Sequence, residues 1–371
     1  MKSIHDKYAE LLVHYCLELK PGERLLIKSS ILAEPLVRAI YKVVLDLGAV
    51  METQFTFQEE KRLLFTRGSD FALSYVSPLT RTGFAEYEAF LAIRSPYNMA
   101  EDQNIDNERL KKLQESLAPI SQTYSERTAT RSLKRCLCQY PTNAAAQRAN
   151  MSLEEYEHFV YSACKLYDDD PIQSWKNVGL KQQGVVDILN ESNHIHYLGE
   201  HVDLQFSTVG RTWINSDGKT NMPSGEVYTS PVENSVNGHI HFSYPGFYRG
   251  HKVEDVTLWF KDGRIEKWEA KQGKDYLDKI FAMQGTRTLG EAAIGTNYDI
   301  QQLTNNILFD EKIGGTVHVA IGQSYKQAGG KNISPVHWDM ITDMSEQGAI
   351  FANGAKIYEN GHFLPEIAES F

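Results

Sequence analysis

Residues 256–268 read VTLWFKDGRIEKW, and this stretch indicates the architecture of the second half of the chain. Apolar and polar residues alternate on both sides of Asp262-Gly263. Such alternation is typical of strands with one buried face, and Asp-Gly between two alternating runs is a strong β-hairpin signal. The surrounding segment, 194–270, is rich in Thr, Val, Tyr, Phe and Gly in short runs between turn residues. We therefore predict a β-rich region here, followed by a helix over 273–283 and a strand over 315–322.

The first part of the chain has a different pattern. Residues 5–18 and 33–47 have the spacing of amphipathic helices. The segments 24–27 and 49–57 have strand character. Helices that alternate with strands predict an α/β layer with parallel strands. Further helices with a polar face are predicted over 101–119 and 152–170.

The length of the chain predicts two domains, because 371 residues exceed what one compact core of ordinary size holds. The change of pattern places the boundary near residue 185. The predicted fold is therefore an α/β N-terminal domain, residues 1–185, and a β-rich α+β C-terminal domain, residues 186–371.

Composition excludes several classes of partner. The 38 basic and 48 acidic side chains give a formal charge of −10, which argues against nucleic acid and against an anionic membrane as partners. The N-terminus has no apolar stretch of the secretory kind, and no run approaches the ~18–20 apolar residues of a membrane span. Four cysteines in a chain of this length make no disulfide framework. We therefore predict a cytoplasmic protein with reduced cysteines.

Several familiar catalytic motifs do not occur in the sequence. It contains no H-E-x-x-H, no G-x-S-x-G and no Walker-type phosphate loop. The absence of these motifs argues against a thermolysin-like zinc site, an α/β-hydrolase serine and a P-loop enzyme.

The C-terminal half instead concentrates histidines and carboxylates beside turn residues. His337 and Asp339 flank Trp338, so both side chains point to the same face of an extended segment. Mixed histidine and carboxylate ligands suit Zn²⁺, Mn²⁺ or Co²⁺, and bridging carboxylates hold two such ions ~3.5–4 Å apart. Taken singly, each residue also fits a structural role as a helix cap, a solvated charge or a hydrogen-bonded core histidine. The other candidates are Glu226, Glu291, Glu311 and His318.

Four blocks of sequence carry a family resemblance. They occur in the order NMPSGEVYTSPVENSVNG, LGEAAIGTN, DEKIGGTVHVAIGQSY and HWDMI, with the candidate ligands in register. Together they resemble the thermophilic metallo-aminopeptidase family that includes aminopeptidase T, aminopeptidase S and PepS. The resemblance extends over nearly the whole chain and is most specific from 210 to 342.

The resemblance implies a metal-dependent aminopeptidase that releases N-terminal residues from short peptides with a free N-terminus. It implies two divalent metal ions (Zn, Co, Mn or Mg) in the C-terminal domain, and a homodimer. Glu311 would be a further ligand or the catalytic base. Tyr325 would stabilise the developing oxyanion through its hydroxyl. The implied metal ligands are Glu226, Glu291, His318, His337 and Asp339.

Two alternatives follow from the same residues. A dinuclear phosphoesterase would need basic side chains near the ligands to hold phosphate, and Lys312 and Lys326 are the candidates. A non-catalytic metal-binding or peptide-binding protein is expected if Glu311 and Tyr325 lie far from the metal ligands. His239 and His241 share one face of a predicted strand, and we assign them a structural or surface role.

Overall fold

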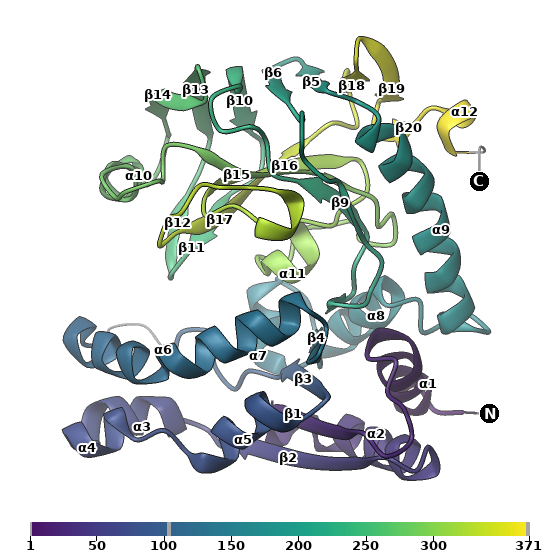
Figure 1. Ribbon diagram of the computed structural model, residues 1–371, viewed down its shortest axis with the longest axis vertical. Coiled ribbons are helices and arrows are strands. Elements are labelled where there is room, and N and C mark those ends of the chain that lie inside the picture. The colour runs from purple at the N-terminus through teal and green to yellow at the C-terminus, as the bar shows by residue number, and fades with distance from the viewer. Residues whose placement is uncertain (1, 102–104, 369–371) are drawn as a thin grey trace. The chain divides into compact units, whose positions relative to one another are not determined.

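The computed structural model describes residues 2–101 and 105–368 (Figure 1). The chain forms two compact units. The first unit comprises Met1–Ile172 and Gly218–Pro223, and the second comprises Gln173–Asp217 and Ser224–Phe371. The predicted boundary near 185 lies within α9 (Pro171–Asn190), the helix at which the chain passes from the first unit to the second.

The first unit contains a parallel sheet with the strand order β2-β1-β3-β4-β8. Its strands are β1 (Arg24–Ser30), β2 (Val50–Thr56), β3 (Ala89–Arg94), β4 (Lys134–Gln139) and β8 (Asn221–Met222). Its helical elements are α1 (Ile4–Glu10) with the π-helical turn η1 (Leu11–Cys16), the 3₁₀ turn η2 (Ile31–Ala33), α2 (Glu34–Asp46), α3 (Glu60–Arg67), α4 (Asp70–Ser74), α5 (Pro78–Glu86), α6 (Asn107–Ala129), α7 (Asn143–Arg148) and α8 (Leu153–Ala163). The α/β prediction for this half is confirmed.

Local sequence explains where the first helices begin and which face they bury. The side chain of Ser3 accepts a hydrogen bond from the backbone of Asp6, whose carboxylate accepts one in return, so α1 begins with a capping box. In α2 the apolar residues recur at helical spacing and are buried on one stripe, against which α1 packs. The buried residues of α2 are Leu36, Val37, Ala39, Ile40 and Val44.

Two helix predictions differ from the structure at their ends. Residues 102–104, at the start of the predicted helix over 101–119, lie outside the described residues. From Asn107 the helix α6 continues beyond Pro119 to Ala129, since it packs against α4 and α5. The predicted helix over 152–170 ends earlier, at Ala163, and Lys165 has a left-handed backbone (φ 58°).

Among the described residues, no helix combines the length and the apolar character needed to cross a membrane.

The second unit is built from antiparallel sheets. An eight-stranded sheet has the order β14-β13-β10-β6-β5-β18-β19-β20, and a five-stranded sheet has the order β17-β16-β15-β9-β7. The strands of the larger sheet are β5 (His194–Gly199), β6 (Val202–Ser207), β10 (Asn237–Phe242), β13 (Val256–Lys261), β14 (Arg264–Glu269), β18 (Ala349–Ala352), β19 (Ala355–Glu359) and β20 (His362–Phe363). Those of the smaller sheet are β7 (Ile214–Ser216), β9 (Glu226–Thr229), β15 (Leu289–Gly295), β16 (Thr316–Gly322) and β17 (His337–Asp343). The unit also contains the pair β11 (Gly246–Tyr248) and β12 (His251–Val253), with α10 (Lys274–Phe281), α11 (Ile307–Asp310), the 3₁₀ turn η3 (Lys326–Ala328) and α12 (Pro365–Ala368).

One hydrophobic core joins the two sheets of this unit. It includes Leu204 and Leu258 from the larger sheet and Val227 and Val319 from the smaller one. Both faces of β15 and β16 are buried throughout, so these two strands lie in the middle of the unit. The prediction of a β-rich α+β region in the second half is confirmed.

The hairpin predicted at Asp262-Gly263 is present, and it joins β13 to β14. Both turn residues have positive φ, 49° and 81°, as a two-residue turn of the type favoured in hairpins requires. A side chain at Gly263 would also collide with the backbone, because an added Cβ would lie 1.7 Å from the carbonyl oxygen of Glu233. The same turn chemistry recurs at Asn353-Gly354 and Asn360-Gly361.

Candidate metal centre

Adjacent strands of the five-stranded sheet carry five of the predicted site residues. Glu226 is the first residue of β9, Glu291 lies on β15 and His318 on β16. His337 and Asp339 lie on β17, one residue apart, so both point to the same face. The four strands are neighbours in the sheet, which brings residues separated by more than 100 positions together.

Each of these side chains has a small residue opposite it in one of its neighbouring strands, and His318 also pairs with Ile341. Glu226 pairs with Gly295, and His337 pairs with Gly322. Ala293 stands opposite His318, while Ala320 stands opposite both Glu291 and Asp339. Cross-strand partners share a face of the sheet. The short partners therefore reduce crowding between the candidate ligands.

The loop before β9 fixes the backbone position of Glu226. Gly225 has φ +111°, and an added Cβ there would lie 2.7 Å from Cβ of Asn297, so only glycine fits. The buried Gln182 side chain on α9 donates to the carbonyl oxygen of Glu226 at 3.1 Å. These contacts hold the backbone of Glu226 on both sides.

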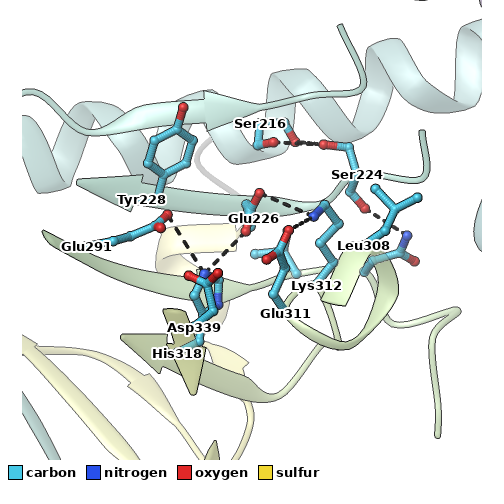
Figure 2. A network of polar contacts seen from close by, with 12 residues as sticks. Ser216, Ser224, Glu226, Tyr228, Glu291, Leu308, Glu311, Lys312, His318 and Asp339 are labelled. Carbon is cyan, nitrogen blue, oxygen red and sulfur yellow. Dashed lines mark hydrogen bonds and ion pairs between the residues drawn. The ribbon is translucent and has the colours of Figure 1, made fainter. Parts of the chain in front are cut away.

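Glu291 contacts both histidines of the cluster, and its contact with His318 is drawn in Figure 2. Its Oε1 is 3.8 Å from Nε2 of His318, and its Oε2 is 3.1 Å from Nε2 of His337. Glu226 Oε2 lies 3.5 Å from His318 Nε2, and Asp339 Oδ1 lies 3.4 Å from His337 Nε2. The two oxygens of Glu291 therefore face two different histidines.

Three groups of residues have the geometry to hold a metal ion, because their ligand atoms lie within 4.8 Å of one another. The first two groups share Glu291. The third shares His318 with the first and Asp339 with the second. The groups are Glu226, Glu291 and His318; Glu291, His337 and Asp339; and Glu311, His318 and Asp339.

The two residues predicted for catalysis also lie at this cluster. Glu311 follows α11 and belongs to the third group. The hydroxyl of Tyr325 lies 3.4 Å from Nε2 of His337. The structure therefore brings together all seven residues that the sequence singled out. His239 and His241 are on β10 of the other sheet and belong to none of the three groups.

Lys312 is a member of the cluster that sequence reasoning considered only as a phosphate ligand. Its side chain is fully buried, with 0% exposure. Nζ donates to Glu311 Oε1 and lies 3.6 Å from Glu226 Oε1 (Figure 2). In the sequence three adjacent charges, Asp310, Glu311 and Lys312, stand between Phe309 and Ile313, and nothing local indicates which of them are buried and paired.

The donor set fits divalent metal ions. Nδ1 of His337 donates to the carbonyl oxygen of Gln323 at 2.8 Å, which leaves Nε2 as the metal-binding nitrogen. Within the described residues, the buried atoms Nδ1 of His318 and Oδ1 of Asp339 meet no hydrogen-bond geometry, although Oδ1 of Asp339 lies 3.4 Å from Nε2 of His337. Buried polar atoms are normally satisfied, and a bound ion would supply a partner at this cluster.

Electrostatic interactions shift the pKa values of these groups strongly. Burial lowers the pKa of both histidines, but their carboxylate neighbours outweigh it and raise the pKa of His318 to about 9 and that of His337 to about 12. Burial, with Glu226 and Asp339, raises the pKa of Glu311 to about 7, although Lys312 opposes this. Burial also raises the pKa of Asp339, but His337 more than reverses this and holds it well below its usual range. Without metal, protonated histidines and Lys312 neutralise the carboxylates.

Oxygen and imidazole ligands beside a carboxylate and a tyrosine hydroxyl suit a metal-dependent hydrolase. The chain belongs to the thermophilic metalloprotease family M29, whose model matches residues 1–363. The sequence-based recognition of this family is confirmed, and so is the prediction of a metal-dependent peptide hydrolase.

Characterised relatives match over most of their length. Aminopeptidase 2 of Geobacillus stearothermophilus is 28% identical over 350 residues, which covers 86% of this chain and 83% of the relative. Aminopeptidase AmpS of Bacillus subtilis (strain 168) is 28% identical over 359 residues, covering 89% and 87%. The solved structure of wild-type AmpT from Thermus thermophilus has a TM-score of 0.83 at 21% identity, covering 97% of this chain and 99% of that chain. This last comparison confirms the fold.

Metal binding should strengthen as the pH rises. A metal ion binds neutral imidazole, so it must displace the protons that His318 and His337 hold below pH 9. We expect the logarithm of the association constant for Co²⁺ or Mn²⁺ to rise by about 1 to 2 per pH unit between about pH 6 and 8. Calorimetric titration of chelator-treated protein in buffers of different ionisation enthalpy measures this proton release. His241→Ala, outside the cluster, should keep the same slope, and a pH-independent constant would contradict the linkage.

Gly290 should be essential for the orientation of His337. An added Cβ at Gly290 would lie 2.2 Å from the carbonyl oxygen of Gln323, which is the acceptor for His337 Nδ1. Gly290→Ala should cost about 1–3 kcal/mol of stability and weaken metal binding about 10- to 100-fold, because it displaces this acceptor. Thermal unfolding and metal titration test both effects.

Gly199→Ala is the matched control, since its Cβ would approach no closer than 3.7 Å. If the Gly290 variant bound metal as tightly as the control, the Gln323–His337 bond would have no role in the site.

Proposed function

We propose that this chain is a metallo-aminopeptidase that uses two divalent metal ions to release N-terminal residues from short peptides. Membership of the metalloprotease family makes it a peptide hydrolase, and the names of similar proteins, aminopeptidase 2 and aminopeptidase AmpS, support the aminopeptidase specificity. The observation that carries the dinuclear site is Glu291, whose two oxygens face separate histidines in two ligand groups. A carboxylate placed in this way is suited to bridge two ions.

Each proposed ion has three protein ligands. Glu226, Glu291 and His318 would hold one, and Glu291, His337 and Asp339 would hold the other. When bound, the ions would supply Lewis acidity that polarises the scissile carbonyl and lowers the pKa of water. The ligands accept several divalent ions, so Zn, Co, Mn and Mg are all candidates.

Glu311 is suited to act as the general base. Burial raises its pKa to about 7, near the pH at which a cytoplasmic enzyme works. A base with such a pKa can take a proton from water and later pass it to the leaving amine. Its place in the third ligand group puts its carboxylate beside His318 and Asp339 rather than in bulk solvent.

Tyr325 is suited to stabilise the oxyanion. The negative charge of Glu291, together with burial, raises the pKa of Tyr325 far above its ordinary value, so the hydroxyl stays protonated. A neutral hydroxyl next to His337 can donate a hydrogen bond to the oxygen on which negative charge develops.

The alternatives fit the geometry less well. A phosphoesterase would need a basic side chain available to phosphate. Lys312 is fully buried and paired with Glu311 and Glu226, which leaves the exposed Lys326 as the one remaining candidate of the two. A silent binding protein was expected if Glu311 and Tyr325 lay far from the ligands, and both lie at the cluster. Cytoplasmic location and homodimerisation stay predictions from sequence and family resemblance.

The direct test is hydrolysis of aminoacyl-p-nitroanilides and short peptides by chelator-treated protein with Co²⁺, Zn²⁺, Mn²⁺ or Mg²⁺ restored. We expect metal-dependent release of single N-terminal residues, and no cleavage when the peptide amino group is acetylated. Glu291→Ala should reduce kcat/KM to below about 1% of wild type, because it removes a ligand common to both groups. The exposed Glu266→Ala is the matched control and should keep full activity.

Three results would overturn the proposal. Full turnover after metal removal would exclude a metal mechanism, and equal cleavage of acetylated peptides would exclude an aminopeptidase. Metal binding without turnover of any peptide would favour the silent binding protein.

A further inference from the structure

Lys312 is held in place by its backbone as well as by its side chain. Its N–H donates to the carbonyl oxygen of Phe309, and its own carbonyl accepts from the N–H of Asn297, both at 2.9 Å. The preceding turn is fixed by Asp310, whose carboxylate accepts from the backbone and hydroxyl of Thr304 at 2.8 Å. The ammonium therefore projects from a rigid segment between α11 and β16.

The two oxygens of the Glu226 carboxylate have different neighbours, and the ammonium group of Lys312 is one of them. Nζ is 3.6 Å from Oε1, while Oε2 lies 3.5 Å from Nε2 of His318. One oxygen thus faces the lysine and the other faces the metal ligands. Such an arrangement favours a monodentate role for Glu226.

Glu311 is held in a comparable way. Its Oε1 accepts from Nζ of Lys312, yet its carboxylate also lies within the group formed with His318 and Asp339. A carboxylate this close to two metal ligands can bind the ion itself unless another cation retains it. Lys312 is that cation, and a compact ammonium with three donors can serve both carboxylates at once.

We propose that Lys312 is a positioning residue that keeps Glu311 beside the metal ions as a base and prevents it from becoming a ligand. The inference rests on the proposed function, because it assigns the role of a residue in that site. It adds a built-in cation that orients Glu226 and Glu311 before any metal binds.

The test compares Lys312→Met, which keeps a similar side-chain volume without the charge, with wild type and with Lys181→Met on the exposed face of α9. Each protein is loaded with Co²⁺, and the bound Co²⁺, its visible absorption and the kinetics are measured. We expect Lys312→Met to bind as much Co²⁺ as wild type. Its absorption should weaken, because Glu311 adds a ligand and raises the coordination number. We expect kcat to fall about 100-fold with KM changed less than about threefold, since the base is lost.

A second pair of variants shows whether Lys312 acts through Glu311. In the Glu311→Gln background, Lys312→Met should lower kcat no further, and the absorption of the double variant should match that of Glu311→Gln alone. The comparison also tests the inference if Lys312→Met alone does not fold. The double variant has no Glu311 charge that would be left unpaired.

Two outcomes would overturn the inference. One is a folded Lys312→Met protein with wild-type absorption and kcat. The other is a further tenfold loss of kcat when Lys312→Met is added to Glu311→Gln. The absorption of bound Co²⁺ does not depend on turnover, so failure of the aminopeptidase proposal would be recognised separately in the wild-type assay.

Discussion

Four carboxylates, Glu226, Glu291, Glu311 and Asp339, converge in a largely buried region of the second unit. Two like charges about 4 Å apart repel by about 4 kcal/mol at the effective dielectric constant near a protein surface. The fold holds the group together with cations: Lys312 and two histidines whose pKa values are raised. In this account divalent ions take over the role of the histidine protons, so metal binding and the integrity of the site are coupled.

The five-stranded sheet makes this convergence possible. Four of its strands place one candidate ligand each, or two at alternate positions, on a single face, and each candidate has a glycine or alanine opposite it in one neighbouring strand. Local backbone features then refine the positions. Gly225 allows the chain to pass close to Asn297, and Gly290 allows the Gln323 carbonyl to reach His337. Replacing such residues would disturb the site without removing any ligand.

Much of the fold was predictable where the signal is local. The Asp262-Gly263 hairpin follows from two residues with positive φ between alternating runs. Helix ends were less predictable. The helix predicted over 101–119 continues past Pro119 because α6 packs on α4 and α5, and α9 lacks a clear amphipathic pattern. The seven site residues came from ordered sequence blocks rather than from spacing alone. The role of Lys312 was not predictable, because the pairing depends on where Glu226, 86 positions earlier, is brought by the sheet.

The central claim is that two divalent ions share Glu291. Crystals soaked with Mn²⁺, Co²⁺ or Zn²⁺ and measured at the absorption edge of the metal would test it directly. The account predicts two anomalous peaks on either side of Glu291, one beside Glu226 and His318 and the other beside His337 and Asp339. A single peak, or full occupancy that leaves Glu291 without contact to metal, would contradict it.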